Sequence, residues 1–90
     1  MHYVYLMAGV HDPKRRYVGL TSDLRTRLAD HNAGKSPHTA KYRPWRLVAY
    51  IAFSDRAQAA AFEAYLKSGS GHAFARKRLW SMAPAADVTQ

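Results

Sequence analysis

Two stretches at the start of the chain carry the residue types of β-strands, and a polar turn separates them. β-forming residues are concentrated in residues 2–8 and again in residues 16–20. The segment between them, residues 11–16, is polar and basic and contains Pro13. This pattern predicts a β-hairpin with a basic loop.

A first helix is predicted over residues 23–33. Hydroxyl and carboxylate side chains at its start can cap it, and Gly34 is a suitable stop. With the helical period, Leu24, Leu28 and His31 fall on one stripe. An imidazole therefore shares a helix face with two leucines.

The middle of the chain contains its most apolar run. Residues 35–42 form a basic connection without regular periodicity, closed by Pro44, and such a loop is free to touch a ligand. Residues 45–53 follow as a strand. Their apolar content predicts a central position in the sheet.

Two further helices are predicted after this strand. Residues 54–55 can cap an Ala-rich helix that runs to Lys67, and the Ser-Gly-Ser-Gly sequence of residues 68–71 breaks it. A third, basic helix is predicted over residues 72–80. The ten residues that follow it are expected to be frayed.

The order of these elements predicts an α/β fold of the α+β type. The first connection is a hairpin too short for a crossover, so the three strands should be mainly antiparallel, with helices flanking the small sheet. Ninety residues fit one domain. We place it at residues 1–81, with residues 82–90 as a flexible C-terminal tail.

Composition indicates a globular protein without disulfides. Apolar residues make up 48% of the chain and aromatic residues 12%, which suffices for a packed core, and there is no cysteine. The five histidines are scattered without close metal-ligand spacing. Neither a signal segment nor a bilayer-spanning apolar run is recognisable, so a cytoplasmic protein with no membrane partner is expected.

The charge of the chain points to a polyanionic partner. Fourteen Lys and Arg residues face six acidic residues, for a net charge of +8. Coulomb attraction and counterion release make nucleic acid the leading candidate, although a basic protein with no specific ligand or a ribosome-associated protein also fits. The residues expected to contact nucleic acid are Lys14, Arg15, Arg16, Lys35, Lys41, Arg43 and Arg76.

Arg27 and His31 are candidates for phosphate chemistry. They stand four residues apart on one face of the predicted helix and can point together at a phosphate. A guanidinium would hold a non-bridging oxygen in a fork of hydrogen bonds. Alternatively, Arg27 pairs with Asp23 or Asp30 on the surface and His31 is an ordinary amphipathic residue.

Two tyrosines and one carboxylate complete the candidate set. Tyr5 and Tyr17 lie on predicted strands, where packing is the ordinary role, and a phenol becomes a useful base only where a metal ion or an arginine favours phenolate. Glu63 is the only glutamate in the chain. It can pair with Lys67 one turn away, or it can bind a Mg²⁺-like ion that keeps most of its waters.

The ordered set of these residues resembles the GIY-YIG nuclease family. Along the chain the matching positions are residues 3–5 (Tyr-Val-Tyr), residues 17–19 (Tyr-Val-Gly), Arg27, His31 and Glu63. Residues 41–45 and 63–71 also look like the small single-domain bacterial members. The first motif departs from Gly-Ile-Tyr, and no asparagine follows Glu63.

The resemblance implies hydrolysis of a phosphodiester by water with help from a divalent ion, Mg²⁺ or Mn²⁺. Tyr17 is favoured as the residue that activates the water, with Tyr5 orienting it, although the two could exchange roles. Arg27 would bind the phosphate, His31 would support the network, and Glu63 would hold the single metal ion.

The predicted function is therefore that of a metal-dependent DNA endonuclease. Because no separate specificity module is recognisable, single-stranded or branched DNA cut with low sequence specificity is favoured. Tyr42 or Trp45 could stack a base, unless both belong to the core. A catalytically silent nucleic-acid-binding module is the alternative, and a protein-interaction subunit with an acidic partner is a third possibility.

Overall fold

A three-stranded antiparallel sheet forms the middle layer of the molecule, in the order β2-β1-β3. The computed structural model describes residues 1–80, so the tail predicted over residues 82–90 lies outside the described residues. The elements are β1 (His2–Gly9), β2 (Arg16–Thr21), α1 (Leu24–Asn32), α2 (Pro37–Ala40), β3 (Trp45–Phe53), α3 (Arg56–Leu66), α4 (Gly69–Ala75) and the π-helical segment η1 (Arg76–Trp80).

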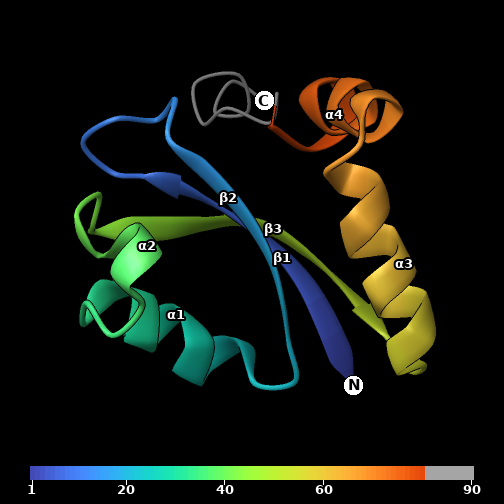
Figure 1. Cartoon of the computed structure of the whole chain (residues 1–90), viewed down its shortest axis with the longest axis horizontal. Coiled ribbons are helices and arrows are strands. Elements are labelled where there is room, and N and C mark those ends of the chain that lie inside the picture. The colour runs from blue at the N-terminus through green and yellow to red at the C-terminus, as the bar shows by residue number, and fades with distance from the viewer. Residues whose placement is uncertain (81–90) are drawn as a thin grey trace, which may run out of the picture.

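Helices cover both faces of this sheet (Figure 1). Because alternate residues of a strand point to opposite faces, β1 contributes to two separate cores. Val4 and Leu6 pack with Ala59, Leu66 and Ala75 of α3 and α4 on one face. On the other face, Tyr5, Met7 and Trp45 pack with Leu24 and Leu28 of α1. The predicted α+β class and the antiparallel sheet are confirmed.

The predicted helix starts and the hairpin are present. Asp23 caps α1, since its carboxylate accepts a hydrogen bond from the Thr26 amide at 3.1 Å. Asp55 caps α3 in the same way through the Gln58 amide at 3.3 Å. The predicted stripe of α1 also faces inward, and its His31 is fully buried.

The prediction that residues 45–53 form the central strand is wrong. β1 is central, and β3 pairs only with β1 among the described strands. The reason is visible in the burial of the two strands: six consecutive residues of β1 are buried, whereas Tyr50 of β3 is 52% exposed. β3 is therefore an edge strand although its sequence is apolar, and one of its aromatic side chains, Tyr50, is exposed.

Two further segments differ from the sequence prediction. Residues 37–40 of the predicted loop form the short helix α2, which begins with Pro37. The Ser-Gly-Ser-Gly segment ends α3 as predicted, but it also starts α4, three residues earlier than expected. Ser68 explains both effects, because its hydroxyl donates to the Tyr65 carbonyl at 2.6 Å and accepts from the Gly71 amide at 3.2 Å.

Gly71 is required where α4 meets the end of α3. A Cβ at this position would collide with the carbonyl of Tyr65. This close approach sets the turn that brings η1 back toward the sheet, where Leu79 and Trp80 pack against the core. None of the helices within residues 1–80 is both long and apolar enough to cross a bilayer.

Candidate active site

A buried hydrogen-bond chain connects Tyr5, His31 and Thr39. The Tyr5 hydroxyl lies 2.8 Å from His31 Nε2, and His31 Nδ1 lies 2.7 Å from the Thr39 hydroxyl. All three side chains are at most 1% exposed. The imidazole of His31 is therefore held by partners on both of its nitrogens.

The partners of Thr39 assign the tautomer of His31. The Thr39 hydroxyl donates to the Ser36 carbonyl at 3.4 Å, so its oxygen accepts the proton of His31 Nδ1. His31 Nε2 is then the acceptor for the Tyr5 hydroxyl. Burial, and secondarily the charge of Arg27, lowers the pKa of His31 from 6.5, which favours this neutral form.

Gly19, the last residue of the second motif, makes room for Tyr5. The two residues are directly opposite each other in the pairing of β1 with β2. A Cβ on Gly19 would collide with the phenol carbon and hydroxyl of Tyr5. The glycine thus lets the Tyr5 ring lie across the backbone of β2 and reach His31.

Tyr17 lies diagonally from Tyr5 on the same face of the sheet, because it pairs with Met7. Its ring centroid is 6.2 Å from that of Tyr5 and 5.1 Å from that of His31. Tyr17 differs from Tyr5 in being only half-buried. It also lines a pocket, so it is the more accessible of the two tyrosines.

Arg27 contacts this pair from α1. Its guanidinium interacts with the Tyr5 hydroxyl, which raises the pKa of Arg27. Burial raises the pKa of Tyr5, and the positive charge of Arg27 opposes that effect. The predicted grouping of Arg27 with the tyrosines is thus present in the structure, and Asp30 acts on Arg27 only as a weaker neighbouring charge.

Glu63 approaches from the other side of the sheet, on α3. Its carboxylate pairs with Lys67 Nζ at 2.6 Å, and the side chain is 22% exposed. Its negative charge nevertheless acts on the Tyr5 hydroxyl and contributes to the raised pKa of that phenol. Of the two alternatives considered for Glu63, the structure shows the ion pair with Lys67, and the metal role stays a prediction.

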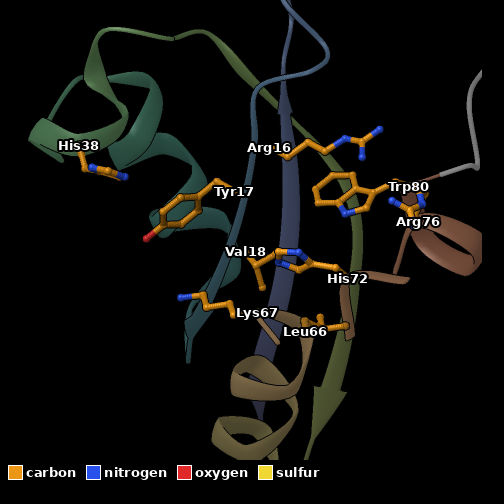
Figure 2. Close-up of a pocket in the computed structure, with 9 residues that line it drawn as sticks. All are labelled: Arg16, Tyr17, Val18, His38, Leu66, Lys67, His72, Arg76 and Trp80. Atoms are coloured by element: carbon orange, nitrogen blue, oxygen red, sulfur yellow. The ribbon is translucent and has the colours of Figure 1, made fainter. Parts of the chain in front are cut away.

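The edge strand β2 is where the two faces meet. Consecutive residues Tyr17 and Val18 point to opposite faces, yet both line one pocket of about 460 Å³. Lys67, the C-terminal cap of α3, and His38 of α2 line the same pocket, as Figure 2 shows. The pocket therefore wraps over the edge of β2 and connects Tyr17 on one face with the end of α3 on the other.

The donor set suits a weakly held hard cation. Within residues 1–80 no three His, Cys, Asp or Glu side chains gather into a metal cluster. Glu63 offers one carboxylate, and carboxylate and phosphate oxygens are the ligands with which Mg²⁺ keeps several of its waters. The residues present thus fit such an ion, provided that Lys67 gives up its contact with Glu63.

The residues expected to contact nucleic acid are only partly near this site. Arg16 and Arg76 line the pocket. Arg15 stacks over the Tyr42 ring at 4.1 Å, with Lys41 at 5.5 Å from the same ring. The other three are exposed and do not line this pocket: Lys14, Lys35 and Arg43.

The structure decides the role of Trp45, which the sequence left open. Trp45 is 5% exposed and donates its indole N–H to the Thr39 carbonyl at 3.0 Å, so it belongs to the core. Sequence reasoning missed Thr39, which lies in the segment read as a loop. A short helix with Pro at its start is the signal that could have revealed it. His72, Trp80 and Lys67, which line the pocket, were not singled out as site residues either.

Comparisons with known proteins agree with this geometry. A model of the GIY-YIG catalytic domain family matches residues 1–77. A UPF0213 protein of Streptococcus pyogenes serotype M3 is 41% identical over 66 residues, which cover 72% of this chain and 70% of that protein. A structure-specific endonuclease subunit SLX1 homolog of Giardia intestinalis is 35% identical over 65 residues, which cover 68% of this chain but 18% of that protein.

A solved structure shows the same fold. The solution NMR structure of a UPF0213 protein from Bacillus halodurans matches with a TM-score of 0.53 and 29% identity, covering 98% of this chain and 93% of that chain. The site and the fold together define a small nuclease-type domain. The chain belongs to the GIY-YIG family, as the resemblance of its motifs predicted. Membership of this family supports nuclease activity.

Proposed function

We propose that this protein is a metal-dependent DNA endonuclease whose active site straddles the edge strand β2. The observation that carries the proposal is the buried Tyr5–His31 hydrogen bond of 2.8 Å, which lies beside the half-buried Tyr17 and next to Arg27. Core packing alone does not require a buried tyrosine to contact both an arginine and a histidine. The same groups are suited to hold a phosphate and activate a water.

Tyr17 is the favoured general base. It lines the pocket, where a water beside a bound phosphate can reach its hydroxyl, whereas Tyr5 is 1% exposed and bonded to His31. Tyr5 acts as a positioning residue. Its hydroxyl is held by His31 and interacts with Arg27, and its ring lies beside that of Tyr17. Arg27 binds a non-bridging oxygen and stabilises the negative charge that develops during attack by water.

Glu63 would hold a Mg²⁺ or Mn²⁺ ion, which when bound supplies positive charge to the leaving oxygen. Lys67 neutralises Glu63 until then, because the two side chains form an ion pair. Opening that pair leaves the ammonium of Lys67 in the same pocket as Tyr17, where it can meet a substrate phosphate.

The proposed substrate is single-stranded or branched DNA, cut with little sequence preference. Flexible strands can bend around the edge of a sheet more easily than a continuous duplex can. The printed name of the Giardia intestinalis relative, a structure-specific endonuclease subunit, favours branched forms within this class. Location in the cytoplasm and the limits of the domain at residues 1–81 remain predictions from the sequence.

A catalytically silent nucleic-acid-binding module is the second candidate. The observation in its favour is the short ion pair between Glu63 and Lys67, which occupies the carboxylate proposed to bind metal. Such a module would keep the fold and the net charge of +8 and bind DNA through them.

Incubation with end-labelled DNA separates the two candidates. Single-stranded, blunt duplex and branched DNA of one sequence are compared with Mg²⁺, with Mn²⁺ and with EDTA. The endonuclease proposal expects shortened products in metal alone, formed faster from single-stranded or branched DNA than from the duplex. Mobility shifts of intact DNA in every lane would establish the silent module, and discrete cutting at one duplex sequence would overturn the proposed substrate.

A further inference from the structure

The pocket at the edge of β2 extends well beyond Tyr17. Its far wall is built by the end of α3, by α4 and by η1, and Figure 2 shows His72, Arg76 and Trp80 there. This wall exists because Gly71 lets α4 turn tightly against the end of α3. Neither the phosphate chemistry at Tyr17 nor that at Arg27 uses it.

Positive charge dominates this pocket. Among the described residues, those lining it include three permanent cations, Arg16, Lys67 and Arg76, and no acidic side chain. Lys67 is neutralised by Glu63. Neither Arg16 nor Arg76 forms an ion pair with a carboxylate of residues 1–80. Two guanidinium groups are therefore available for an anion, and phosphate is the anion that their planar forks hold best.

The wall also offers flat apolar surface. Trp80 is half-buried, and it packs against the core through part of its ring. The Arg16 guanidinium lies 4.8 Å from the centroid of the Trp80 indole, so the two side chains fix each other at the pocket. The exposed imidazole of His72 lines the pocket beside them. A cationic groove with such rings is the combination that binds single nucleic-acid strands.

We propose that this pocket binds the nucleotide next to the phosphodiester that is cut. Arg16 and Arg76 hold its phosphate, and the rings of His72 and Trp80 contact its base. The inference rests on the proposed function, because Tyr17 and Lys67 join this subsite to the catalytic groups. It identifies the direction in which the strand leaves the active site: along β2 toward η1, away from Thr21.

Binding without cleavage tests the subsite independently of catalysis. An eight-nucleotide labelled oligothymidylate is titrated in EDTA, and fluorescence anisotropy gives the Kd of the wild type, of Arg76→Ala and of Arg78→Ala. Arg78 is the matched control, since it lies on the same segment η1 and is exposed but does not line the pocket.

The proposal expects Arg76→Ala to raise Kd about tenfold and to reduce the salt slope of binding by about one, while Arg78→Ala changes Kd less than threefold. Equal effects of the two variants would overturn the subsite, because that is the behaviour of diffuse surface charge. An absence of cleavage by the wild type in Mg²⁺ would overturn the nuclease proposal instead, whatever the two Kd values are.

Tryptophan emission reports on the base contact. Trp80 is the more accessible of the two tryptophans, since Trp45 is 5% exposed. Oligothymidylate should quench this emission more strongly than an abasic oligonucleotide of equal length, and Trp80→Phe should lose most of the difference. Equal quenching by both ligands would contradict the proposed contact between the base and Trp80.

Discussion

The phenol of Tyr5 occupies the space directly over Gly19, its partner across the β1–β2 pair. Each residue belongs to a different sequence motif, and neither motif by itself shows why the other is needed. The glycine leaves room for the ring over the edge strand, from where its hydroxyl reaches His31 Nε2 at 2.8 Å. Tyr5 of the first motif therefore requires a residue without a side chain at position 19, in the second motif.

Gly19→Ala should destabilise the protein by about 1–3 kcal/mol, because the new methyl group forces the Tyr5 ring to move within a filled core. Activity should fall with it, since the Tyr5–His31 hydrogen bond is broken. Urea unfolding measures the first effect. Gly69→Ala is the control: no atom lies within 4 Å of the added Cβ, so its free energy of unfolding should be unchanged or slightly higher. Similar losses in both variants would contradict the packing argument.

His31 should make stability depend on pH. Its pKa in the folded protein is lowered from 6.5 by burial, so the unfolded chain takes up a proton more readily than the folded protein does. The contribution is complete above pH 6.5 and is lost as the pH falls from there through the lowered folded value. Urea unfolding between pH 8 and pH 5 should show this decline in the wild type. His31→Gln should flatten it, and an identical slope in the variant would contradict the assignment of a neutral buried histidine.

Arg27→Lys should reduce the rate of cleavage on the order of 10²-fold although the charge is kept. A lysine ammonium cannot supply the planar fork that holds a phosphate oxygen while also contacting the Tyr5 hydroxyl. Single-turnover cleavage at saturating metal gives the rate. Arg25→Lys, exposed on the same helix, is the matched control. Turnover at the wild-type rate by Arg27→Lys would contradict a role of the Arg27 guanidinium in binding the phosphate.

Tyr17→Phe and Tyr5→Phe should separate activity from stability. Tyr17→Phe removes a hydroxyl at the pocket, so the cleavage rate should fall on the order of 10²- to 10⁴-fold with little change in unfolding. Tyr5→Phe leaves His31 Nε2 buried without its partner, which should cost about 1–3 kcal/mol of stability and a smaller share of the rate. A larger rate defect in Tyr5→Phe, measured on equally folded proteins, would transfer the role of base to Tyr5.

The sequence predicts the fold and the site unevenly. Local signals were sufficient for the hairpin, for α1 with its Asp23 cap and for α3 with its Asp55 cap, because capping and periodicity act within a few residues. Strand order is a tertiary property. The apolar run of β3 suggested a central strand, whereas β1 holds that position because both of its faces are covered by helices.

The site shows the same limit. The motifs identified Tyr5, Tyr17 and His31. Pro37 could have signalled the four-residue helix that carries Thr39, but the contact of Thr39 with the histidine is a tertiary one. The wall formed by Arg76 and Trp80 depends on how closely α4 approaches α3 at Gly71. Such close approaches depend on the packing between elements, so they cannot be predicted from the spacing of residues along the chain.

We propose that Glu63 works at the same site as the tyrosines although it lies across the sheet from them. Cleavage and binding of one single-stranded DNA by the wild type and by Glu63→Gln, at saturating Mg²⁺, test it most directly. The variant keeps the shape of the side chain and removes the charge that pairs with Lys67. We expect the rate of cleavage to fall on the order of 10²-fold or more while Kd is unchanged or lower, since the protein becomes more positive. Cleavage at the wild-type rate by the variant would contradict the proposal.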